Sequence, residues 1–91
     1  MLVAKEPQYM VLSNRSPHPL ALILEPWGDT TTLNPNSSVR IKFQGPDNGS
    51  LEIEHSESVV TIFGWPGSTV SIFSDDQELG GGKWSRGPAP G

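Results

Sequence analysis

The sequence predicts an all-β fold, an antiparallel β-sandwich of about seven strands, and three observations support this prediction. Ten glycines and nine prolines divide the 91 residues into short runs rich in Val, Ile, Leu, Phe and Thr. Within these runs, apolar and polar residues alternate with a period of two, as in strands that bury one face. Turn signals recur every eight to twelve residues or so, a spacing typical of sandwiches and small barrels.

The alternation is clearest at residues 38–44, where Val39, Ile41 and Phe43 point one way and Arg40 and Lys42 point the other. The same reasoning predicts two inward pairs, Val60 with Ile62 and Val70 with Ile72. The complete set of expected strands lies near residues 8–13, 19–25, 30–33, 38–44, 51–55, 58–63 and 68–73, with 76–79 as a candidate eighth.

Seven strands within about 75 residues leave no room for crossover helices, so we expect the sheets to be largely antiparallel. An immunoglobulin- or cupredoxin-like sandwich is favoured over a closed barrel. This is a resemblance of architecture alone, because no family motif accompanies it.

Two turns can be assigned a type from their residues. In the run 65–68, Pro66 occupies the second position and Gly67 the third, which suits a type II turn. The run 34–37 has the same arrangement, with Pro35 second and Asn36 in the position that requires a left-handed backbone.

A change of composition divides the chain into a sandwich domain at residues 1–79 and a tail at 80–91, which is rich in Gly and Pro and expected to be flexible unless Trp84 docks. Residues 1–79 hold four basic and all ten acidic residues, a net charge of −6, whereas the tail holds Lys83 and Arg86 and no acid. An acidic body repels a phosphate backbone, so nucleic acid is not expected as a partner.

The sequence lacks the residues that several kinds of catalytic and metal site require. The chain has no cysteine, which excludes disulfides, thiolate catalysis and a blue-copper site. Two histidines are present: His18 lies between prolines, and His55 ends the inward series 51–53–55, which predicts a ring at the core edge with a hydrogen-bonded nitrogen. Glu52 and Glu54 are expected on the outer face of that strand, where charge prevents pairing with neighbours. We therefore predict no enzyme activity, no metal and no cofactor.

Tryptophans in predicted turns are the candidate functional residues. Trp27 and Trp65 are each flanked by Pro and Gly. One interpretation is that each ring folds back to plug an end of the sandwich; the other is that they form, with Tyr9 or Trp84, an aromatic surface that receives a sugar or a partner. The flanking residues fit both interpretations.

The resulting functional hypothesis is a non-catalytic interaction or accessory domain that binds a protein or itself, through an exposed strand edge or its tryptophan loops. A carbohydrate-binding module that stacks sugars on Trp27 or Trp65 is the second hypothesis, and a small hydrolase or metalloenzyme around His55 is the third. No apolar run reaches signal-peptide or membrane-spanning length, so we expect a soluble cytoplasmic protein with no membrane partner.

Overall fold

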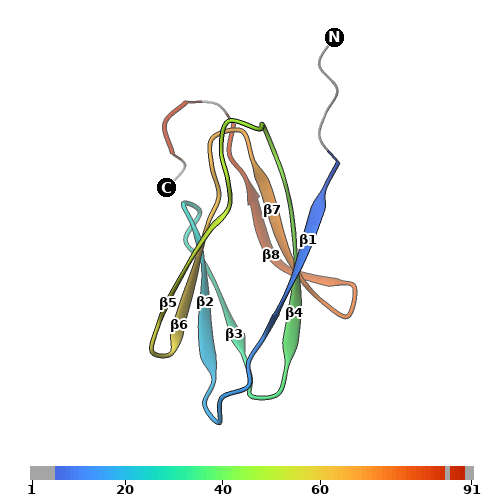
Figure 1. Ribbon diagram of the computed structural model, residues 1–91, viewed down its shortest axis with the longest axis vertical. Coiled ribbons are helices and arrows are strands. Elements are labelled where there is room, and N and C mark those ends of the chain that lie inside the picture. Colours follow the sequence, from blue (N-terminus) through green and yellow to red (C-terminus); the bar gives the residue numbers. More distant parts are fainter. Residues whose placement is uncertain (1–5, 86, 90–91) are drawn as a thin grey trace.

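The structure, a computed structural model, describes residues 6–85 and 87–89. Within these residues eight strands form two four-stranded sheets that face each other as a sandwich (Figure 1). The described residues contain no helix. The strands are β1 (Gln8–Ser13), β2 (Leu20–Glu25), β3 (Asp29–Leu33), β4 (Ser38–Gln44), β5 (Glu52–Ser56), β6 (Val59–Phe63), β7 (Thr69–Ser74) and β8 (Gln77–Lys83). The predicted all-β sandwich is confirmed, and the candidate eighth strand is present.

Sheet A has the strand order β1-β4-β7-β8 and sheet B the order β3-β2-β6-β5. Among the described strands, β2 pairs with β6 in parallel and the other pairings are antiparallel. The prediction of largely antiparallel sheets is therefore confirmed, and the parallel pairing of β2 with β6 is the exception. Between β2 and β6 the chain passes through β3, β4 and β5 and returns in its original direction, a long-range path that alternation along a single strand does not reveal.

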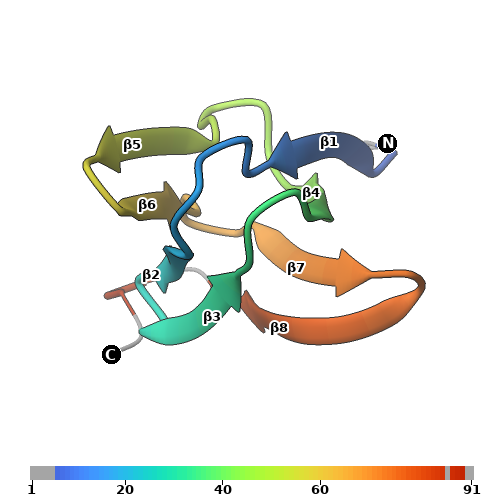
Figure 2. The same ribbon diagram turned by 90° about the horizontal axis from the view of Figure 1, so that it is seen from below.

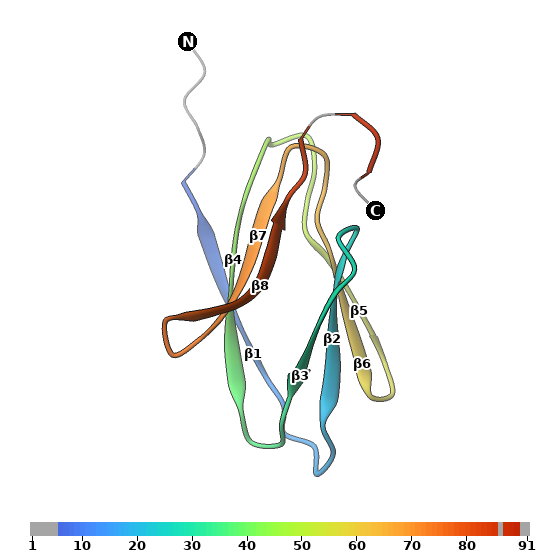
Figure 3. The same ribbon diagram turned by 180° about the vertical axis from the view of Figure 1, so that it is seen from behind.

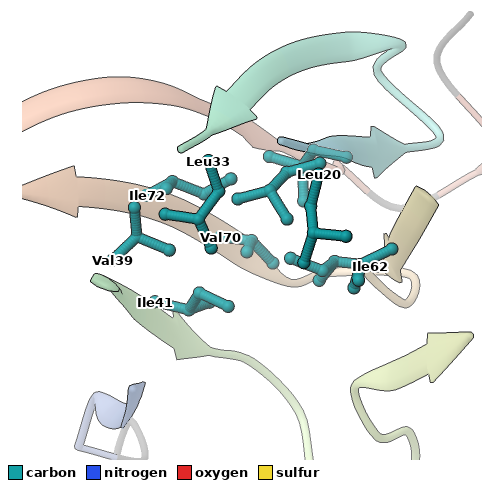
Figure 4. Close-up of a cluster of buried hydrophobic side chains, with 10 residues drawn as sticks. Leu20, Leu33, Val39, Ile41, Ile62, Val70 and Ile72 are labelled. Atoms are coloured by element: carbon teal, nitrogen blue, oxygen red, sulfur yellow. The ribbon is translucent and has the colours of Figure 1, made fainter. Parts of the chain in front are cut away.

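The core lies between the two sheets and consists of aliphatic side chains from alternate strand positions. The predicted inward pairs of β6 and β7 are buried, and so are Val39 and Ile41 of β4. Figure 4 shows these side chains converging from both sheets. The complete buried cluster is Leu20, Leu22, Leu24, Leu33, Val39, Ile41, Val60, Ile62, Val70 and Ile72.

Both turns assigned from the sequence have the expected backbone. Gly67 has a φ of 89°, and Ser68 N donates to Trp65 O at 2.8 Å, which closes the turn. Asn36 has a φ of 61°, and Ser37 N donates to Asn34 O at 3.2 Å. A left-handed residue at the third position is what a type II turn requires.

Strand β8 extends to Lys83, four residues beyond the predicted domain boundary at 79. The glycines at 80–82, which suggest a tail by composition, are paired with β7, and Gly82 lies opposite Val70. Trp84 continues the ladder, because its N donates to Ser68 O and its O accepts from Gly67 N, each at 2.8 Å. The sandwich therefore includes the first residues of the predicted tail.

Strand β5 points as predicted but is not buried. Ile53 lies opposite Ile62 and His55 opposite Val60, so both face the inner side of sheet B. Ile53 is nevertheless 41% exposed, and all five residues of β5 are exposed. The prediction that His55 lies at the edge of the core is therefore wrong, because its side chain is exposed. Strand β5 is the last strand of its sheet, and the core ends at β6.

Candidate functional site

Trp65 fills one end of the sandwich. Its side chain is 9% exposed, its Nε1 donates to Pro46 O at 2.9 Å, and its ring meets the ring of Phe43 edge-on with centroids 6.5 Å apart. A Cβ atom added at Gly49 would lie 2.0 Å from the Trp65 ring, so the indole packs directly against the backbone of Gly49. This geometry fits the plug interpretation and leaves little of the ring for a ligand.

Trp27 lies across the same end and bridges the two sheets. A Cβ at Gly82 of sheet A would come within 2.3 Å of its ring, and a Cβ at Gly64, just after β6 of sheet B, within 2.6 Å. Its Nε1 donates to Lys83 O at 3.3 Å, and the side chain is half-buried. The ring therefore packs on two glycine backbones.

The other two aromatic candidates lie in different places. Trp84 is half-buried and shares a shallow hollow of about 440 Å³ with Trp65, Pro26 and Pro66. Tyr9 lies on the outer face of sheet A, 55% exposed, with the guanidinium of Arg40 5.4 Å from its ring centroid. The structure thus gathers three tryptophans at one end and leaves Tyr9 on a sheet face.

The burial of Trp65 can be checked by fluorescence. In a protein whose other tryptophans are replaced, with Trp27→Phe and Trp84→Phe, the remaining indole should be quenched by iodide at least about fivefold less than free tryptophan, because a charged quencher does not enter a packed apolar site. The matched variant that keeps only Trp84 should be quenched more strongly. Equal quenching of both variants would contradict the buried position of Trp65.

One lateral side of the sandwich is closed and the other is open. On the closed side β3 and β8 approach each other (Figures 2 and 3). There Gly81 N donates to Asp29 Oδ2 at 3.2 Å. On the other side β1 and β5 are the free edges of their sheets. A groove of about 490 Å³ lies there, and both β1 and β5 contribute to it.

The groove is lined mainly by apolar and uncharged groups. Met10 comes from β1, Phe43 from β4, Ile53 from β5, and Trp65 closes the end. Glu6 is the one charged residue that lines it within the described chain. The inward-facing Ile53, exposed because no described strand lies beyond β5, is part of this surface.

Strand β1 is an edge without charge. Its six residues include no Lys, Arg, Asp or Glu, and it presents Tyr9 and Val11 on the outer face, 55% and 65% exposed. Proteins usually protect an exposed edge with charge, proline, a bulge or a covering segment. Edge strand β5 carries Glu52 and Glu54, and β3 and β8 cover each other. Within residues 6–85 and 87–89, edge β1 has none of these protections.

The backbone of β1 offers hydrogen-bonding groups along that edge. Asn14 N donates to Ser37 O, and Asn14 O accepts from Asn36 N, so residue 14 faces β4. Successive residues of an antiparallel strand face opposite sides, so Tyr9 and Val11 turn their N–H and C=O groups away from β4. In the described chain no strand pairs with this side of β1.

Neither histidine belongs to a cluster of ligands. His18 and His55 are both exposed, and His55 Nε2 lies 3.2 Å from Glu57 O. Across residues 6–85 and 87–89, no group of three or more His, Cys, Asp or Glu side chains could hold a metal ion. The same residues contain no helix long and apolar enough to cross a membrane.

Apart from Tyr9, the surface formed by β1 and Ile53 is not among the residues that the sequence predicts as functional. The available signal is that residues 8–13 have apolar side chains at both odd and even positions and no charge. No protein-family model, curated protein or solved structure matches this chain.

Proposed function

We propose that this protein is a non-catalytic interaction module that binds an extended segment of a protein along its open side. The observation that carries the proposal is the uncharged edge of β1 beside an apolar groove. An extended segment that adds to a sheet edge gains affinity from main-chain hydrogen bonds and specificity from alternate side chains. Here Tyr9 and Val11 supply the backbone groups, and every second side chain of the segment faces the groove.

The groove favours apolar side chains in the bound segment. Met10, Phe43 and Ile53 present carbon surface that is partly exposed to water, and covering it is favourable by roughly 25 cal/mol per Å². The lining residues that the structure describes include no basic group, so they offer an acidic side chain in the segment no partner. The best ligand is therefore an extended segment with apolar residues at alternate positions.

The proposal can be tested by selecting displayed peptides on the immobilised protein and then comparing their binding to Val11→Pro. Because the N–H of Val11 faces away from β4, proline removes a bond to the ligand and none to β4. We expect the enriched peptides to show alternating apolar residues and to bind Val11→Pro at least about tenfold more weakly, a loss of 1.4 kcal/mol or more.

Leu79→Ala is the matched control, because Leu79 is an exposed apolar residue on the opposite edge of sheet A. It should leave peptide affinity unchanged. If Val11→Pro is poorly folded by circular dichroism, slowed amide exchange at Tyr9 and Val11 upon peptide addition to the natural protein provides the test. Peptides that bind both variants equally, or that protect other amides, would overturn the proposal.

A further inference from the structure

We infer that the segment which pairs with β1 is the β1 strand of a second copy of this chain, in antiparallel register about a two-fold axis at Val11. This inference rests on the proposed function, which specifies the edge and leaves its occupant open. The pairing joins the two copies of sheet A into one continuous sheet of eight strands, with β1 and its symmetry mate at the centre.

Lack of charge on β1 favours a copy of itself as partner. Across a two-fold axis, the residue on the axis lies opposite itself and its neighbours lie close to their own copies, so a charged residue there would meet its own charge. Like charges directly opposite each other destabilise a strand pair. Strand β5 carries Glu52 and Glu54 and is unsuited to such self-pairing, whereas β1 has only neutral side chains to bring together.

The register at Val11 satisfies both the backbone and the faces of the sheet. In it Val11 lies opposite Val11 of the second copy, Tyr9 lies opposite Ser13, and Met10 lies opposite Leu12. The opposed residues Val11, Tyr9 and Ser13 are those that turn their backbone groups away from β4, so they exchange hydrogen bonds across the new pairing. Each pair also joins residues of the same face, because opposed positions are both odd or both even.

The charges that flank β1 are complementary in this arrangement. Glu6 precedes the strand by two residues and Arg15 follows it by two, and both are exposed. Antiparallel self-pairing places the start of one strand beside the end of the other, so the acidic end of each strand lies beside the basic end of its mate. A parallel pairing would instead place like charges together. The flanking residues thus support the antiparallel arrangement.

The same arrangement uses the groove. The inward side chains of the second β1, Met10 and Leu12, extend the inner face of sheet A toward the exposed side of Ile53. Each copy uses the same surface as its mate, so the contact closes on itself and yields dimers rather than filaments.

Sedimentation velocity between about 1 and 500 µM tests the inference. We expect the natural protein to approach twice the monomer mass at the high end, and Val11→Glu and Val11→Lys each to remain monomeric, because each places like charges at the axis. An equimolar mixture of the two variants should recover the dimer, since opposite charges then meet. Leu79→Glu, which adds the same charge on the far edge, should still dimerise.

Two further readouts locate the contact. Amide exchange of Tyr9, Val11 and Ser13 should slow with rising protein concentration, while that of Met10 and Leu12, whose amides face β4, should stay constant. Glu6→Lys should weaken the dimer by roughly threefold to tenfold, because it replaces attraction between the oppositely charged strand ends by repulsion, an effect of the size of exposed charge interactions. Concentration-dependent protection needs no substitution, so it decides the matter even if a variant folds poorly.

A protein that stays monomeric at every concentration, or a dimer that persists in both Val11 variants, would overturn the inference. If the protein is monomeric and selected peptides still bind at Val11, the proposed function stands with another partner. If neither dimer nor peptide binding involves β1, both proposals fail.

Discussion

Replacing Asn14 by aspartate is expected to destabilise the fold by about 3–5 kcal/mol at neutral pH. Asn14 is 1% exposed, and its Nδ2 donates to His18 O at 2.8 Å and to Leu33 O at 3.0 Å. Its Oδ1 accepts from Ser16 N at 2.9 Å and from Ser16 Oγ at 2.7 Å. Asn14→Asp keeps the shape but turns both donors into an oxygen that faces two carbonyl oxygens.

Urea denaturation of the natural protein and the variant measures this loss. Asn48→Asp is the matched control, because Asn48 is exposed, and it should cost less than about 0.5 kcal/mol. Burial against carbonyl oxygens would raise the pKa of the introduced carboxyl above its unfolded value of about 3.9. Because the folded pKa then lies above the unfolded one, the loss of unfolding free energy is smallest below the unfolded pKa and grows as the pH rises toward the folded pKa. The difference in unfolding free energy between the variant and the natural protein should therefore be smaller at about pH 4 than at neutral pH. A gap independent of pH would contradict this account.

The role of Asn14 shows what sequence reasoning misses. Asn14 begins an Asx-turn, in which Ser16 N donates to Asn14 Oδ1, and asparagine is a common residue in such turns. One bond of Nδ2 stays within the same loop and reaches His18 O, but the other reaches Leu33 O at the end of β3, 19 residues away. Such long-range partners depend on the tertiary fold, so an asparagine in a loop gives no sign that it is buried.

The fold itself was largely predictable, because period-two alternation is a local signal with a direct physical cause. Strand β4 was placed at 38–44 and observed at Ser38–Gln44, and its inward residues Val39 and Ile41 are buried. The predicted end of the sandwich domain is wrong because strand pairing, which the composition does not show, continues beyond it. The composition around Gly80 and Gly82 predicts a flexible tail, yet they are strand residues whose missing side chains leave space for β3 and for Trp27.

The open side was less predictable, because its features are properties of strand order. Alternation places Ile53 on the inner face, but its exposure depends on β5 being the last strand of sheet B. In the same way, β1 has a free edge only because β4 pairs with one side of it and no other described strand with the other. Strand order in a sandwich follows from contacts distant in sequence, which a single sequence does not display.

Replacing Trp65 by alanine is expected to cost about 3–5 kcal/mol, the range for a large aromatic side chain removed from a core. The indole closes the end of the sandwich, contacts Phe43 edge-on and satisfies Pro46 O, so its loss leaves a cavity and an unpaired carbonyl. Trp84→Ala, which removes a half-buried indole, should cost clearly less. The free energies of unfolding from urea titration give the comparison, and equal losses would contradict the plug role of Trp65.

Gly49→Ala should produce a large part of that loss without touching the tryptophan. The new methyl would lie 2.0 Å from the Trp65 ring, so either the indole or the 45–51 loop must move, at an expected cost of about 1–3 kcal/mol. A double-mutant cycle identifies the cause. Once Trp65→Ala has removed the ring, Gly49→Ala should cost less than about 0.5 kcal/mol, because the glycine is required only to admit the indole. A cost that persists in the Trp65→Ala background would show instead that Gly49 is required by its own backbone.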